Sequence, residues 1–158
     1  MTRTLQLLMV IYVSSGVVIP ALASTEFSDL LSRNTELISK SSSKTVDPVL
    51  NEIQNFGGHQ AISFLANWKD KKIFSLKETG QFVLAVPAGT DDEGRKLLAI
   101  TDIVTSAKLG VVPAKKVRQV KPNSGVRAKI ASAMVPFQLV SHDAEIRATG
   151  LKTIYRDI

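Results

Sequence analysis

The amino-terminal segment constrains this chain most, because it separates a short apolar leader from the part that must fold on its own. Residues 1–23 contain Arg3 near the start, an apolar stretch from Leu5 to Ile19, and an exit with Ala21 and Ala23. A charged start, a short apolar centre and a small-x-small exit are typical of a secretory signal peptide. We therefore expect export, with residues 1–23 removed by cleavage after Ala23.

An uncleaved membrane anchor is the alternative interpretation of this segment. The apolar stretch is interrupted by Gln6, Ser14, Ser15 and Gly16, and it is shorter than the roughly 20 residues that a spanning helix needs. We therefore prefer the interpretation that residues 1–23 are a cleaved signal peptide. We expect the protein in the periplasm, or at the periplasmic face of the inner membrane if the leader stays attached.

The remaining residues, 24–158, are enough for a single extracytoplasmic domain with a hydrophobic core. The chain has no cysteine, so this domain forms no disulfide and offers no thiolate chemistry. Its stability must come from packing.

The charge balance is basic, with 20 lysines and arginines against 14 acids and a net charge of +6. Such an excess favours an acidic protein or the head groups of a membrane surface as partner, or it is simply a solvated surface. The basic residues are scattered except for one group, which is the candidate partner contact: Lys115, Lys116, Arg118 and Lys121. Nucleic acid is not expected as a partner of an exported protein.

Apolar periodicity predicts an α+β fold that is mainly α, with a small antiparallel β insert between helical parts. Residues 24–72 are expected to be helical, with helices over 24–43, from Asp47-Pro48 to Gly57-Gly58, and on to Trp68. Ser24 or Thr25 is expected to cap the first helix, and Asp47 the second, with Pro48 at its first position. Residues 73–121 form the β insert. Its expected parts are a hairpin of Ile73–Leu76 and Phe82–Val86, a loop over Pro87–Gly94, strands over Leu97–Ile103 and Val117–Val120, and turns at Gly110 and Pro113.

Residues 122–158 are predicted to be helical again. Asn123 is expected to cap one helix, which Pro136 would kink near its end, and Asp143 is expected to cap the last helix. The domain would then consist of short helical hairpins on both sides of the sheet.

No set of side chains in the sequence predicts catalysis, a cofactor or a metal. His59 and His142 stand at expected helix starts without further ligands nearby, and Asp91, Asp92 and Glu93 lack the alternating ligands of a calcium loop. No Gly-x-Ser-x-Gly elbow or glycine-rich phosphate loop is present. Trp68 is expected in the core, with an interface anchor as the alternative.

Several segments carry a resemblance when they are taken in order. They are Gly57-Gly58 through Ala61, Ile62 and Leu65 to Trp68; Asp70 to Phe74; Lys115 to Arg118; Asn123, Val126, Arg127 and Ile130; and Asp143, Ile146 and Arg147. The last segment is similar to the start of a HEAT-type repeat. Together they resemble the extracytoplasmic region that precedes the membrane-spanning part of the urea ABC transporter permease, a subunit akin to the branched-chain amino acid permeases.

The resemblance implies structural roles for Asn123, Arg127, Asp143 and Arg147, and a place beside a permease, its ATPase and a periplasmic urea-binding protein. Gly150 departs from the family pattern, where Ala is usual, and so do Gly58 and His59, where Asp-Pro is usual. The membrane-spanning helices of the family are missing from these residues, so this polypeptide is not expected to translocate urea itself. The resemblance therefore predicts a non-enzymatic domain that assists assembly or partner contact. A stand-alone secreted module with HEAT-like helices is the alternative.

Overall fold

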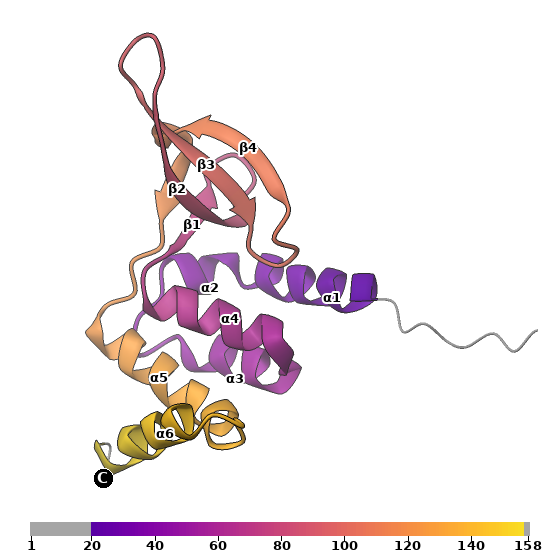
Figure 1. Ribbon diagram of the computed structural model, residues 1–158, viewed down its shortest axis with the longest axis vertical. Helices are drawn as coiled ribbons and strands as arrows, with labels where there is room; N and C mark the ends of the chain where they lie inside the picture. The colour runs from indigo at the N-terminus through magenta and orange to yellow at the C-terminus, as the bar shows by residue number, and fades with distance from the viewer. Residues whose placement is uncertain (1–19, 157–158) are drawn as a thin grey trace, which may run out of the picture.

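The computed structural model describes residues 20–156, in which a curved sheet stands on a layer of helices (Figure 1). The elements are α1 (Pro20–Arg33), α2 (Thr35–Ser39), α3 (Asp47–Phe56), α4 (Gly58–Lys69), β1 (Ile73–Leu76), β2 (Phe82–Thr90), β3 (Lys96–Asp102), β4 (Lys108–Pro113), the 3₁₀ turn η1 (Ala114–Lys116), β5 (Val117–Gln119), α5 (Ser124–Leu139) and α6 (Ala144–Arg156). This order confirms an α+β fold in which helix predominates, with the sheet between two helical parts.

The main core lies between the helices and the near end of the sheet. Phe64 of α4 is at its centre, with ring centroids 5.9 Å from Phe27, 5.8 Å from Trp68 and 6.0 Å from Phe82. Phe82 belongs to β2, so this aromatic cluster joins the sheet to the helices. Edge-to-face and tilted aromatic pairs contribute beyond the apolar area that they bury.

The helix predicted over residues 24–43 is two helices, because the chain breaks at Asn34. The Asn34 side chain is buried, and its Nδ2 donates to the Leu30 carbonyl oxygen at 3.0 Å and to Glu52 Oε2 at 3.0 Å. The predicted start at Ser24 or Thr25 also differs, since α1 already includes Pro20. The expected cleavage point after Ala23 therefore lies within α1, while residues 1–19 of the predicted leader lie outside the described residues.

The start of α3 corrects a second prediction. Asp47 is the first residue of α3 and not its cap, which is Val46, whereas Pro48 does occupy the first turn. The Asp47 carboxylate instead pairs with Lys129 Nζ of α5, a residue far along the chain. Gly57, with a φ of 69°, turns the chain from α3 into α4 as expected. That backbone conformation is one that glycine adopts without steric cost.

The sheet has the strand order β4-β3-β2-β1-β5, and every neighbouring pair is antiparallel. The predicted hairpin of β1 and β2 is present, with Phe74 opposite Val83. The strand β5 returns to the other edge, with Ser75 opposite Arg118. The expected hairpin and the expected strand around residues 117–120 are thus confirmed, whereas the other edge strand, β4, was not predicted.

Two predictions in the β insert are wrong. Pro87–Thr90 is not loop, since β2 continues to Thr90 and pairs with β3 across an irregular register; the loop is confined to residues 91–95. Gly110 and Pro113 do not mark turns but lie in β4, where Gly110 is opposite Ile100. Long-range pairing with β3 therefore holds both segments extended despite their turn-forming residues.

The carboxyl-terminal helices begin as predicted. Asn123 Oδ1 accepts from the Val126 amide at 2.9 Å, and Asp143 Oδ1 accepts from the Glu145 amide at 2.8 Å. Pro136 lies inside α5. No helix among residues 20–156 combines the length and apolar character needed to cross a bilayer.

Candidate functional site

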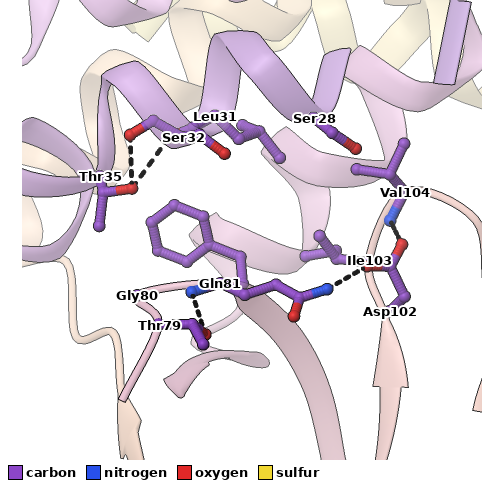
Figure 2. Close-up of a pocket in the computed structure, with 11 residues that line it drawn as sticks. Ser28, Leu31, Ser32, Thr35, Thr79, Gly80, Gln81, Asp102, Ile103 and Val104 are labelled. Carbon is purple, nitrogen blue, oxygen red and sulfur yellow. Dashed lines mark hydrogen bonds between the residues drawn. The ribbon is translucent and has the colours of Figure 1, made fainter. Parts of the chain in front are cut away.

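A cavity of about 300 Å³ lies between the helical layer and the end of the sheet (Figure 2). The first two helices contribute one wall, the β1–β2 turn and the start of β2 a second, and the end of β3 with the following turn a third. The lining residues are Ser28, Leu31, Ser32, Thr35, Thr79, Gly80, Gln81, Phe82, Asp102, Ile103 and Val104. The cavity thus joins three segments that are far apart in the sequence.

Asp102 is the charged group of this cavity. It ends β3 and is only 9% exposed. Its Oδ1 accepts from the amides of Val104 and Thr105, at 2.9 and 2.7 Å, and from Thr105 Oγ1 at 2.9 Å. Its Oδ2 accepts from Gln81 Nε2 at 2.8 Å, a bond visible in Figure 2. One carboxylate oxygen therefore organises its own turn, and the other is held by a side chain of the β1–β2 turn.

The hydrogen bonds decide the ionisation of this carboxyl. Burial disfavours the charged form, but the donors from Thr105, Gln81 and Val104 outweigh burial, so that the pKa of Asp102 lies below its ordinary value. All of these donors are neutral groups. In the part of the chain that the structure describes, none of the ion pairs includes Asp102.

The opposite wall of the cavity carries hydroxyl groups. Ser28 and Ser32 lie four residues apart in α1 and so share one face of that helix. Thr35 faces the same space, but its Oγ1 donates to the carbonyl oxygens of Leu31 and Ser32, at 3.2 and 2.8 Å. Figure 2 shows these groups across the cavity from Gln81.

The predicted basic group lies at one edge of the sheet, around η1 and β5. Lys115, Lys116, Arg118 and Lys121 are all exposed. The lysines just before and just after β1 lie at the same edge. The Lys77 amide donates to the Lys116 carbonyl oxygen at 2.9 Å, and Gln119 Nε2 donates to the Lys71 carbonyl oxygen at 2.8 Å. We call these four residues, together with Lys71, Lys72 and Lys77, the basic edge.

Trp68 is fully buried beside Phe64, so in this structure it is a core residue. A partner could not reach this side chain, so the alternative of an interface anchor does not apply.

The residues with family-implied structural roles lie in α5 and α6 or at their starts. Asn123 and Asp143 cap these helices, as described above. Arg147 Nη1 donates to the carbonyl oxygens of Ser141 and His142, at 2.8 and 2.9 Å, and so fixes the turn between the two helices. Arg127 is exposed in the first turn of α5.

The other charged candidates are separated in space. His59 and His142 are exposed at different helix starts. Asp91 organises the β2–β3 loop: its Oδ1 accepts from the amides of Glu93 and Arg95, and its Oδ2 accepts from Arg95 Nε at 2.6 Å. Among residues 20–156, no cluster of three or more histidine or acidic side chains could hold a metal ion.

Comparison with protein-family models, with curated proteins and with solved structures finds no match to this chain. The cavity was not predicted from the sequence either. The only local signal is the spacing of Asp102 and Thr105, which is typical of an Asp-initiated turn. It does not reveal that Gln81 and the serines of α1 lie opposite.

Proposed function

We propose that this chain is a non-catalytic extracytoplasmic interaction domain of a urea-type ABC importer permease, with the basic edge as its partner contact. The observation that carries this proposal is the gathering of seven basic residues around β1, η1 and β5, all of them exposed. The link to an importer rests on the resemblance of the sequence segments described above. HEAT-like packing of the helices is part of the same proposal.

Most of the basic side chains of the basic edge have no acidic partner among the ion pairs of the described residues. Within the described residues, two of its side chains form ion pairs: Lys72 with Asp70 at 3.7 Å, and Lys116 with Glu78 at 3.1 Å. All four of these side chains are substantially exposed, and such pairs contribute only about 0–1 kcal/mol. They can therefore exchange for contacts with an acidic partner at little cost.

The position of this surface also favours a contact role. β5 is an outer strand with β1 as its neighbour, so one side of its backbone faces away from the sheet. Charged side chains on an edge strand discourage pairing with an unrelated chain. An acidic surface would be attracted to the same edge and oriented by it. The partner we propose is an acidic face of the periplasmic urea-binding protein.

The test is binding of the full chain to that urea-binding protein. The charge-reversal variant Lys115→Glu, Arg118→Glu, Lys121→Glu is expected to bind at least about tenfold more weakly. The variant Lys44→Glu, Lys108→Glu, Lys152→Glu changes the net charge equally at exposed positions elsewhere, and it is the matched control. If both variants weaken binding equally, the weakening comes from the change in net charge alone, and the proposed surface is wrong.

The stand-alone secreted module remains the second candidate, and the gene neighbourhood separates the two. A permease reading frame in or beside this gene, with genes for an ATPase and a binding protein, supports the importer. An isolated gene whose product does not bind the urea-binding protein at high concentration contradicts it.

A further inference from the structure

We propose that the cavity between α1 and the sheet binds a small organic cation with several N–H donors, such as a guanidinium or a primary ammonium. This site is separate from the basic edge and does not depend on the proposed importer role. Its occupant is defined by a buried carboxylate without a cationic partner, by the surrounding acceptors, and by the apolar walls.

The charge at Asp102 is the first step of the argument. A buried charge is normally paired or coordinated, because neutral hydrogen-bond donors only partly replace the water it loses. Asp102 is 9% exposed and keeps its charge at neutral pH, while its partners Gln81, Val104 and Thr105 are all neutral. A cation entering the cavity would complete this site.

The remaining hydrogen-bonding capacity is the second step. A carboxylate oxygen has about two lone-pair positions. Asp102 Oδ1 already accepts from three donors, whereas Oδ2 accepts from Gln81 Nε2. Oδ2 thus keeps about one further position, and Asp102 and Gln81 both line the cavity. The hydroxyls of Ser28 and Ser32 provide further acceptors on the facing wall.

An acceptor-rich site around a negative charge selects a ligand by its donors. An ammonium has three N–H donors and a guanidinium has five, and neither carries an acceptor. Hydrogen bonds from such groups to a carboxylate are shorter and about twice as strong as neutral ones. Leu31, Phe82 and Ile103 line the same cavity and would contact the methyl or methylene part of the ligand.

The size of the cavity limits the ligand to a small molecule. An apolar cavity of about 150 Å³ is sufficient for benzene, so the observed volume of about 300 Å³ accommodates a cation with a short carbon chain. A fragment with about five heavy atoms is expected to bind with a dissociation constant on the order of 1 mM.

The test is an amide-resolved NMR titration of the full chain with methylguanidinium, with N-methylurea as the neutral probe of the same shape. Methylguanidinium is expected to saturate shifts of the Val104 and Thr105 amides, which donate to Asp102 Oδ1. N-methylurea is expected to bind at least about tenfold more weakly, because it lacks the charge. Equal affinity for both probes, or no saturable shift with the cation, would overturn the proposal.

Two variants assign the effect to the carboxylate. Asp102→Asn keeps an acceptor for the turn but removes the charge, and it is expected to lose the preference for the cation. Asp91→Asn is the matched control, since Asp91 also organises a turn but already pairs with Arg95 on the exposed loop. It should bind as the wild type does.

A third variant covers the case in which Asp102→Asn fails to fold. Ser28→Leu would fill the cavity from the α1 wall and leave the Asp102 turn intact, so the cation should no longer shift the Val104 amide. A folded Ser28→Leu variant that still binds methylguanidinium with unchanged affinity would show that the cation binds elsewhere, and the proposed site would be wrong.

Discussion

Gly150 of α6 lies directly against Gln138 of α5. A Cβ atom on Gly150 would be 3.0 Å from Gln138 Cβ, closer than carbon atoms usually approach, and 3.4 Å from Leu139 Cδ2. Glycine at this position therefore allows the two helices to approach each other closely. An alanine at this position would require Gln138 to give by a few tenths of an ångström, and a larger side chain would require more.

Gly150→Leu is therefore expected to detach α6 from α5 while the core between the helices and the sheet remains folded. Overpacking of this kind costs about 1–3 kcal/mol, and the contacts of α6 are concentrated on α5. Amide hydrogen exchange should show faster exchange in residues 144–156 and unchanged protection in α4.

The matched control for this prediction is Ala148→Leu, which adds the same side chain at an exposed position of α6. It should leave exchange in α6 unchanged. Loss of protection in both variants, or in neither, would mean that the close approach at Gly150 does not hold α6 in place.

Asn34→Ala is expected to destabilise the fold by about 1–3 kcal/mol, because it leaves the Leu30 carbonyl oxygen and Glu52 without a buried donor. Glu52 would retain its ion pair with Arg33 at 3.1 Å, but both side chains of that pair are substantially exposed. Urea denaturation should show a lower midpoint. Asn55→Ala, at an exposed position of α3, is the control and should lie within about 0.5 kcal/mol of the wild type.

Asn34 also shows where prediction from the sequence fails. The helices that begin at Asp47-Pro48 and after Asn123 were predictable, because their start signals and apolar spacing are local. The break at Asn34 was not, since the apolar pattern continues across it. At the break the Asn34 side chain donates to Glu52, which lies in a different helix, and the local sequence does not reveal this contact.

The strand β4 and the cavity were missed for the same physical reason. Gly110 has a φ of 106° and is typical of a turn, yet pairing opposite Ile100 keeps it in a strand. The cavity requires Ser28, Gln81 and Asp102 to meet, and no periodicity in the sequence brings them together. Long-range contacts decide both features.

Trp68→Ala is expected to cost about 3–5 kcal/mol, the range for removing a large aromatic side chain from a core. Trp68→Phe should cost clearly less, because the buried Trp68 Nε1 has no hydrogen-bond partner in the described structure, and its removal leaves no group unpaired. Chemical denaturation of both variants measures the difference. Tyr155→Ala, which removes a 76% exposed ring, should change stability by less than about 0.5 kcal/mol. Equal costs for Trp68→Ala and Trp68→Phe would contradict the expectation that an aromatic ring at this position retains most of the packing.

Asp102 should make the stability of the fold depend on pH in the acidic range. Its folded-state pKa lies below the ordinary value of 3.8, because hydrogen bonds from Thr105, Gln81 and Val104 outweigh the effect of burial. A lowered carboxyl pKa adds stability that is complete above the ordinary pKa and is lost as the pH falls through the folded-state pKa. The stability advantage of the wild type over Asp102→Asn is thus expected to be largest near about pH 6 and to shrink toward about pH 2.5. Urea denaturation of both proteins across this range measures that advantage, and comparing them removes the contribution of the other acids. An advantage that stays constant or grows on acidification would show that the folded state does not favour the ionised carboxylate.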